Sequence, residues 1–179
     1  MARVIAVTNQ KGGVGKTTTS INVAYFLSKM GKRTLIIDFD PQGNATSGLG
    51  IDKQELGATM TEVIMRQIRL AKVVLPTEYK DLYLAPSTSH LANTEVELAQ
   101  ADGRFARLRE ALSGVIDYDY IIIDSPPSLS LLTVNGLVAA DYVLLPVQAE
   151  FYALEGLGQL LESMKLIRKG LNPSLKLLG

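Results

Sequence analysis

The most constraining feature of the sequence lies near its N-terminus, where two short apolar runs flank a glycine-rich loop and a helix-forming segment. The β-branched run Arg3–Val7 predicts a strand. Residues 17–30 have apolar and small side chains at helical spacing, and Gly31 predicts the end of that helix. A second strand is expected at 34–37. This order predicts a βαβ unit, and therefore a parallel sheet with a right-handed crossover.

The rest of the chain continues this α/β pattern, and we expect a single domain over residues 1–179. The later strand runs are continuously apolar, which is typical of parallel strands buried on both faces. We therefore expect a mostly parallel sheet with helices on both faces. Thr59 is expected to cap a short helix with Glu62. Further strands are expected at 82–85, 120–123 and 142–147, and residues 175–179 are expected to begin another buried strand. Further helices are expected at 59–66, 88–101, 104–116, 131–140 and 155–168. Residues 38–50 are expected to form a loop.

Composition excludes several kinds of site. The chain has no cysteine, which excludes disulfides, thiolate metal sites and a cysteine nucleophile. Its 18 basic and 18 acidic residues give a formal net charge of zero, so the overall charge favours neither nucleic acid nor an anionic membrane. The sequence has no signal-peptide pattern, and no apolar run approaches the roughly 20 residues of a membrane span. We therefore expect a cytoplasmic chain without a membrane partner.

The loop after the first strand has the pattern of a phosphate-binding loop, or P-loop. Its glycines let successive backbone N–H groups turn inward around an anion, and the following helix adds the positive end of its dipole. Lys16 is expected to contact the β- and γ-phosphates of a nucleotide, and the Thr17 hydroxyl to ligate Mg²⁺. Gln10 replaces the first glycine of the usual G-x-x-x-x-G-K-[ST] pattern, and a chance glycine-rich turn is the alternative. The expected nucleotide contacts are Lys11, Gly12, Gly13, Val14, Gly15, Lys16, Thr17 and Thr18.

Three aspartates at the ends of predicted strands are candidates for metal and water chemistry at the same rim of the sheet. Asp124 ends the run at 120–123 and is expected to hold the Mg²⁺ shell through water; a helix cap or turn before Pro126 is the alternative. Asp38 and Asp40 are two residues apart, so their side chains project similarly if the backbone is extended. One would order Mg²⁺-bound water and the other would orient the attacking water. Plain turn chemistry is the alternative for both.

Lys11 begins the loop, five residues before Lys16 and at the opposite lip. A loop lysine is usually solvated. From this position, however, its ammonium has two possible targets, the phosphates of its own nucleotide and those of a nucleotide held by a second subunit. His90 is the single histidine. It has no acidic or metal-binding partner at a usable spacing, so we expect it to be structural or solvated.

Taken together, these motifs resemble the deviant Walker A family of ParA and MinD ATPases. The loop KGGVGKTT, with its additional lysine, resembles the deviant Walker A motif, and DFDPQGNATSGLG at 38–50 is similar to the ParA/Soj branch in particular. Other similar stretches are LAPS at 84–87, EVEL at 95–98, the segment 121–127, PVQ at 146–148 and ALEGL at 153–157. These stretches follow the family's order along the whole chain.

The resemblance implies an ATPase of chromosome or plasmid partitioning that acts as a nucleotide-gated switch. In this family ATP and Mg²⁺ drive a face-to-face homodimer with the nucleotide between the subunits. Lys11 would then contact the partner's nucleotide, and Gly12 would permit the close approach. Lys16 would bind phosphate and support catalysis.

The same resemblance assigns the acidic residues and the partners. Asp40 would orient the hydrolytic water, and Asp124 would be the Walker B acid. With Asp40 in that role, Asp38 is the further metal candidate beside Thr17. A ParB-like protein would stimulate the weak hydrolysis, and the dimer would bind DNA non-specifically at the nucleoid. Family members extend beyond residue 179, and that part carries adenine contacts and basic DNA-binding residues. We therefore expect DNA binding of the longer protein rather than of this chain.

Two alternatives have different cargo or chemistry. One is a ParA-like ATPase that positions another large cargo. The other is a small-molecule kinase or ligase on the same P-loop scaffold, which would need a substrate pocket opposite the γ-phosphate and would have no need of Lys11. A reductase related to nitrogenase iron protein is excluded because its cluster requires cysteines. A MinD-like membrane switch would need a C-terminal amphipathic helix, which the sequence does not show.

Overall fold

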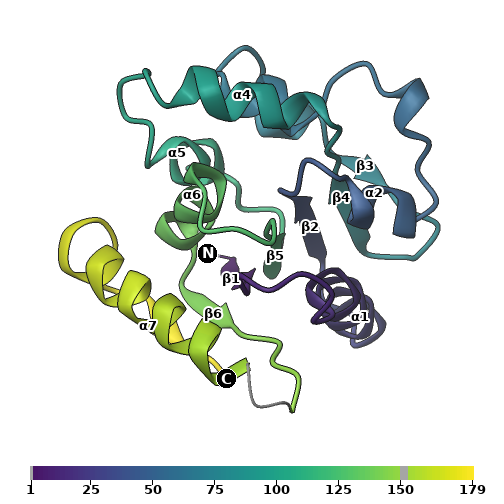
Figure 1. Cartoon of the computed structure of the whole chain (residues 1–179). Coiled ribbons are helices and arrows are strands. Elements are labelled where there is room, and N and C mark those ends of the chain that lie inside the picture. The colour runs from purple at the N-terminus through teal and green to yellow at the C-terminus, as the bar shows by residue number, and fades with distance from the viewer. Residues whose placement is uncertain (1, 150–152) are drawn as a thin grey trace.

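The computed structural model describes residues 2–149 and 153–179, in which seven strands form one sheet of order β3-β4-β2-β5-β1-β6-β7 (Figure 1). Every neighbouring pair is parallel except β3 with β4 at one edge. The predicted α/β fold with a mostly parallel sheet is confirmed. The strands are β1 (Arg3–Val7), β2 (Thr34–Asp38), β3 (Leu75–Pro76), β4 (Leu82–Ala85), β5 (Tyr120–Asp124), β6 (Tyr142–Leu144) and β7 (Lys176–Leu177).

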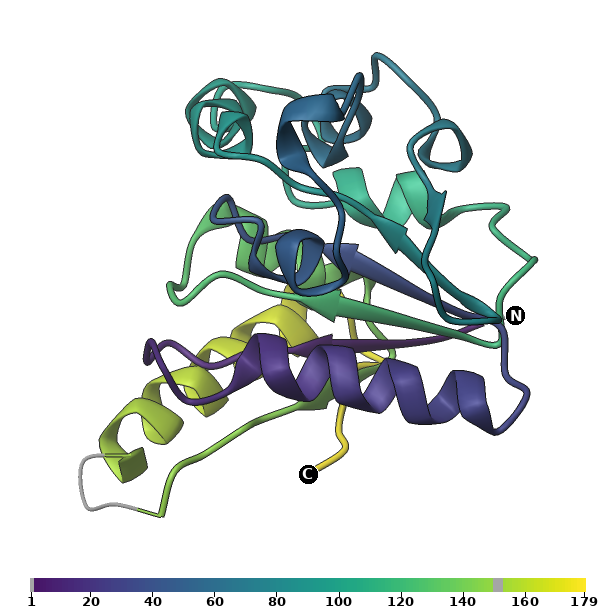
Figure 2. The ribbon, with the colours of Figure 1, turned by 90° about the vertical axis from the view of Figure 1, so that its right-hand side faces the viewer.

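Helices cover both faces of this sheet, as expected. Helices α1 and α2 lie on one face, and the apolar cluster of the other face is completed by α3 to α7 (Figures 1 and 2). Short 3₁₀ helices, η1 and η2, lie in the connections between α2 and β3. The helices are α1 (Lys16–Lys29), α2 (Asn44–Gly48), α3 (Met60–Ile64), α4 (His90–Leu98), α5 (Arg107–Leu112), α6 (Leu131–Ala139) and α7 (Ala153–Gly170), with η1 (Lys53–Glu55) and η2 (Leu70–Lys72).

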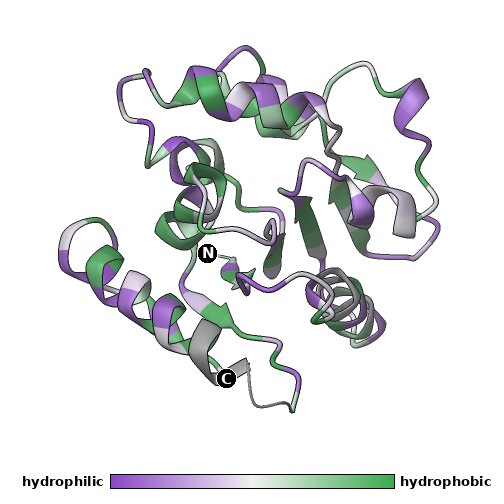
Figure 3. Cartoon of the chain, in the orientation of Figure 1, coloured by the Kyte–Doolittle hydropathy of each residue, from purple (hydrophilic) through white to green (hydrophobic). Residues whose placement is uncertain are grey.

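The strands are continuously apolar because successive side chains enter two different cores. In β1, Ile5 and Val7 pack with Ala24 of α1, whereas Val4 and Ala6 join the core on the other face. Strands β2 and β5 alternate in the same way. The central strands are accordingly the most hydrophobic part of the ribbon, with polar residues along the outer helices (Figure 3). Each of these strands therefore needs a helix on both sides.

Several predicted boundaries are corrected by the structure. The segment 38–50, expected to be a loop, contains α2, which begins after Gly43 in a left-handed conformation (φ 61°). The helices expected at 59–66, 88–101 and 104–116 are shorter, although the Thr59–Glu62 capping box is present. The strand expected at 142–147 ends at Leu144. Strand β7 forms, but its two residues are exposed rather than buried.

The antiparallel edge strand β3 was not predicted. It contains only two residues, one of them Pro76, and a proline is tolerated at the edge of a sheet because its missing N–H is not needed there. None of the described helices combines the length and apolar character required to cross a membrane.

A buried asparagine joins the C-terminal segment to the core. The side-chain amide of Asn172 donates to the carbonyls of Leu137 (3.0 Å), Val138 (3.2 Å) and Ala140 (2.7 Å) at the end of α6. The last carbonyls of a helix have no partner within the helix, so Asn172 satisfies groups that would otherwise be buried without a donor. Ser174 in turn donates to the Asn172 side-chain oxygen at 2.8 Å.

Replacement of Asn172 by alanine is expected to lower the free energy of unfolding by about 2–3 kcal/mol, because several buried carbonyls lose their donor at once. Urea denaturation measures this change. The matched control is Ser174→Ala, which removes one outer hydrogen bond and is expected to cost about 1 kcal/mol or less. A free energy of unfolding for Asn172→Ala within about 0.5 kcal/mol of wild type would contradict the anchoring role.

Candidate nucleotide-binding site

The site lies where three parallel strands end side by side. Strand β5 is between β2 and β1, and Asp124 at its end is in register with Asp38 of β2 and Val7 of β1. The loops that follow these three strands consequently occur at one edge of the sheet (Figure 2). The parallel order thus brings together the glycine-rich loop, the 38–44 segment and Asp124, as expected from the sequence.

The glycine-rich loop has a left-handed backbone at two of its glycines. Gly13 and Gly15 have positive φ values of 74° and 87°, a region that a residue with a Cβ adopts only at a cost. A Cβ added at Gly12, Gly13 or Gly15 would meet no atom within 4 Å, so the loop borders open space. This space is a cavity of about 410 Å³ lined by Gly12, Gly13, Gly15, Lys16, Thr17, Thr18, Asp40, Asn44 and Pro127.

Lys16 is the buried cation of this cavity. Its ammonium donates to the carbonyl of Lys11 across the loop at 3.0 Å. Burial lowers the pKa of Lys16, and the nearby carboxylates of Asp124 and Asp40 oppose that shift. The cavity therefore combines a lysine side chain with backbone amides, the combination that binds phosphate in P-loops.

Asp124 connects the sheet to the first turn of α1. Its carboxylate accepts hydrogen bonds from the hydroxyls of Thr17 (2.7 Å) and Ser20 (2.8 Å). Burial raises the pKa of Asp124 to about 6, although both hydroxyls oppose the shift. Sequence reasoning missed Ser20; its position three residues after Thr17, on the same side of a helix, is the signal that identifies it.

Asp40 follows β2 and lines the same cavity as Thr17. Its carboxylate accepts from the backbone N–H of Gln42 at 2.9 Å, and its carbonyl accepts from the N–H of Gly43 at 2.9 Å. Asp40 is 6% exposed and belongs to the cavity lining. The structure therefore places Asp40 next to the expected phosphate position while a tight turn holds its backbone.

Asp38 is oriented towards different partners. One oxygen of its carboxylate accepts from the backbone N–H (2.7 Å) and the hydroxyl (2.6 Å) of Thr46 on α2. The Thr46 hydroxyl accepts in turn from the N–H of Ser87 at 3.0 Å. Burial raises the pKa of Asp38 to about 7. These contacts favour a structural role for Asp38, and its role in metal binding stays a prediction.

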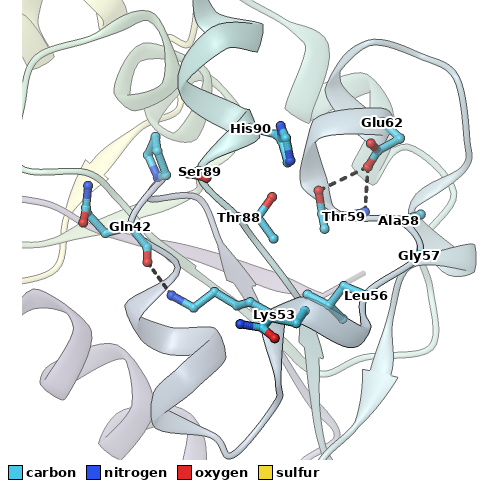
Figure 4. Close-up of a pocket in the computed structure, with 12 residues that line it drawn as sticks. Gln42, Lys53, Leu56, Gly57, Ala58, Thr59, Glu62, Thr88, Ser89 and His90 are labelled. Atoms are coloured by element: carbon cyan, nitrogen blue, oxygen red, sulfur yellow. Dashed lines mark hydrogen bonds between the residues drawn. The ribbon is translucent and has the colours of Figure 1, made fainter.

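Of the other residues singled out in the sequence, Lys11 and His90 are exposed at two different places, and Val14 of the glycine-rich loop is buried. Lys11 is exposed, and its backbone N–H is held by the side chain of Asn9 at 3.0 Å, which also donates to the carbonyl of Pro146 at 2.7 Å. His90 is exposed, as expected, at the beginning of α4. It borders a separate cavity beside the 41–42 segment (Figure 4).

The donor set suits Mg²⁺ bound together with phosphate. Within the parts of the chain that the structure describes, no three or more His, Cys, Asp or Glu side chains form a metal-binding group. Mg²⁺ in nucleotide sites needs only one or two protein oxygens, because waters and phosphates complete its coordination. The Thr17 hydroxyl and the Asp124 carboxylate, 2.7 Å apart beside the glycine loop, fit that pattern.

The contact between Asp38 and Thr46 allows a test of how much the Thr46 hydroxyl contributes to the stability of the structure around the site. Thr46→Val keeps the side-chain shape but leaves a buried carboxylate and the Ser87 N–H without their hydroxyl partner. We expect the free energy of unfolding to fall by about 2–3 kcal/mol. The control Thr46→Ser keeps the hydroxyl, loses one methyl group and should cost about 1 kcal/mol. Chemical denaturation compares the two, and a Val variant as stable as the Ser variant would contradict this account.

Comparison with known proteins identifies the family of this chain. A family model described as an AAA domain matches residues 2–177. The chain is 51% identical over 180 aligned positions to the chromosome partitioning protein ParA of Myxococcus xanthus, covering all of this chain and 64% of that protein. It is 49% identical to the sporulation initiation inhibitor protein Soj of Bacillus subtilis, covering all of this chain and 71% of that protein. The chain thus spans about two thirds of the length of these relatives.

A solved structure shares the fold of this chain. The cobyrinic acid a,c-diamide synthase of Mycobacterium smegmatis with bound ADP and magnesium has a TM-score of 0.96 and 42% sequence identity to this chain. The similarity covers all of this chain and 73% of that one. The family model, the two sequence relatives and the shared P-loop architecture agree that this chain belongs to the ParA/Soj family of P-loop ATPases.

Proposed function

We propose that the chain binds and hydrolyses ATP with Mg²⁺ and serves as a nucleotide-gated dimerisation switch in chromosome or plasmid partitioning. The observation that carries the proposal is the convergence of Lys16, Thr17, Asp40 and Asp124 at one glycine-lined cavity. The partitioning role is supported by the name of the Myxococcus relative, a chromosome partitioning protein. The use of ATP and Mg²⁺ is supported by the ADP and magnesium bound to the Mycobacterium protein.

Each part of the cavity has a separate task in this proposal. The backbone amides of 12–18 and the Lys16 ammonium bind the phosphates, and they are aligned before the nucleotide arrives. The Thr17 hydroxyl and the Asp124 carboxylate hold the metal, directly or through water. Bound Mg²⁺ would supply a positive charge that offsets negative charge on the transferred phosphoryl group.

Asp40 is the residue that we assign to the attacking water. A carboxylate at the edge of the phosphate cavity can accept a hydrogen bond from water and direct its oxygen towards the γ-phosphate. The turn formed by the Gln42 and Gly43 amides restricts Asp40, so the carboxylate is oriented without a large entropic cost.

Lys11 connects the nucleotide to the oligomeric state. It is exposed at the outer lip of the loop, whereas Lys16 is buried inside it. In a face-to-face homodimer, Lys11 of each subunit would contact the phosphates held by the other. Gly12, which has no side chain, allows the two backbones to approach. Loss of the γ-phosphate would remove charge from that contact and favour separation of the subunits.

The wider partners follow from the proposed family role. A ParB-like activator would stimulate the weak hydrolysis of the dimer. Non-specific DNA would be bound by a protein with the full length of the relatives, which would then be cytoplasmic and associated with the nucleoid. The same switch can position another large cargo, because nothing in the nucleotide site itself specifies DNA.

A small-molecule ligase is the second candidate, and two observations support it. The similar Mycobacterium structure is named a cobyrinic acid a,c-diamide synthase. In addition, a cavity of about 590 Å³ lies beside Pro41 and Gln42, next to the residue assigned to catalysis. A ligase of this type acts on a substrate in such a pocket and has no use for a second lysine at the subunit interface, so Lys11 separates the two functions.

The switch predicts a specific pattern of oligomers with ATP and Mg²⁺. Asp40→Ala should bind ATP, fail to hydrolyse it and accumulate as a dimer. In the double variant, which carries Lys11→Ala as well as Asp40→Ala, the dimer dissociation constant should rise by at least about tenfold. The reason is that each subunit loses a charged contact to the phosphates held by the other. Analytical ultracentrifugation measures both.

Lys16→Ala is the negative control, since it should remove nucleotide binding and remain monomeric. Asp40→Ala that stays monomeric at saturating ATP would contradict the dimerisation switch. Hydrolysis that is unaffected by Lys11→Ala, combined with ATP-dependent turnover of a small carboxylic acid, would favour the ligase instead.

A further inference from the structure

Lys53 makes a specific contact with the segment that carries Asp40. Its ammonium donates to the backbone carbonyl of Gln42 at 2.7 Å, from a 3₁₀ helix eleven residues further along the chain. Figure 4 shows this bond at the edge of the 590 Å³ cavity, with the Lys53 side chain extended along the cavity floor. The helix itself is capped by Asp52, whose carboxylate accepts from the N–H of Gln54 at 2.9 Å. The backbone of Lys53 is therefore held in place by the capped 3₁₀ helix.

The methylene part of Lys53 packs against the same segment. Gly43 has φ 61°, and a Cβ at this position would lie 2.6 Å from the carbonyl oxygen of Ser87 and 3.0 Å from Cδ of Lys53. The backbone at Gly43 is thus enclosed between the end of β4 and the lysine side chain. Only glycine combines this close approach with the left-handed conformation.

These contacts reach the carboxylate of Asp40 through a single residue, Gln42. The carbonyl that Lys53 holds belongs to Gln42, and the N–H of the same residue donates to the Asp40 carboxylate at 2.9 Å. The N–H of Gly43 closes the turn on the Asp40 carbonyl. A movement of Gln42 would therefore alter both the turn and the direction of the carboxylate.

We infer that Lys53 is a positioning residue for Asp40, which holds the 40–43 turn in the geometry needed for water attack. The inference rests on the proposed role of Asp40 in hydrolysis. It assigns Lys53 to the chemical step rather than to nucleotide binding, because Lys53 lies outside the phosphate cavity. Lys53 faces solvent through the larger cavity, so its contact with Gln42 is accessible to a competing group.

The test uses Lys53→Met, which keeps most of the packing of the side chain but removes the ammonium. We expect kcat for ATP hydrolysis to fall about fivefold to tenfold with KM within about twofold of wild type, since only the orientation of Asp40 is affected. Lys53→Arg retains a donor and should recover most of kcat. The matched control is Lys72→Met, which changes an exposed lysine in η2 away from the turn and should leave both parameters unchanged.

Amide hydrogen exchange provides a readout that does not require turnover. In Lys53→Met the Gln42 and Gly43 amides should exchange about tenfold faster than in wild type, while the amides of β2 remain protected. Unchanged exchange, or kcat equal to that of Lys72→Met, would overturn the inference. A parallel fall in melting temperature with a raised KM would also overturn it, because that pattern indicates a general structural role. Asp40→Ala at the wild-type rate would instead refute the proposed function and remove the basis for positioning.

Discussion

The buried carboxylate of Asp124 is the contact on which the rest of the site depends. It ends the central strand β5 and accepts hydrogen bonds from Thr17 and Ser20, so it fixes the first turn of α1 against the sheet. With β1 and α1 both fixed, the intervening loop has little freedom, and glycines supply the positive φ values that the remaining geometry requires. The open space beside the glycine-rich loop is thus a consequence of how the strand and helix are joined.

Two aspartates in register on neighbouring strands have different tasks. Asp124 faces the phosphate loop, whereas Asp38 faces Thr46 and, through its hydroxyl, the segment at Ser87. Burial raises the pKa of both carboxyl groups, which means that each depends on its few hydroxyl and amide donors. One carboxylate therefore builds the nucleotide cavity, and the other supports the turn that carries Asp40. This arrangement keeps Asp40, the residue proposed to orient the attacking water, at the cavity beside the glycine-rich loop without making it part of that loop.

The sequence predicts the fold and the position of the site well because both depend on local patterns. Continuous apolar runs indicate strands buried on two faces, and parallel order then places Asp124 and the glycine-rich loop at one rim. The missed features depend on contacts between distant residues. Lys53 meets Gln42 across eleven positions, and Ser87 meets Thr46 across 41. A further contact explains α2: the Asp38 carboxylate accepts from the N–H of Thr46 in the first turn of this helix, a stabilisation that residue propensities do not report.

The most direct test of this account compares ATP affinity with Mg²⁺ and with a chelator in wild type and Asp124→Asn, using calorimetry. Asparagine keeps the size and one acceptor oxygen but removes the charge. If Asp124 and Thr17 hold the metal, Mg²⁺ should increase the ATP affinity of the wild type by about tenfold or more, and Asp124→Asn should lose most of that increase while its affinity in chelator is retained. An undiminished Mg²⁺ effect in Asp124→Asn would contradict the account.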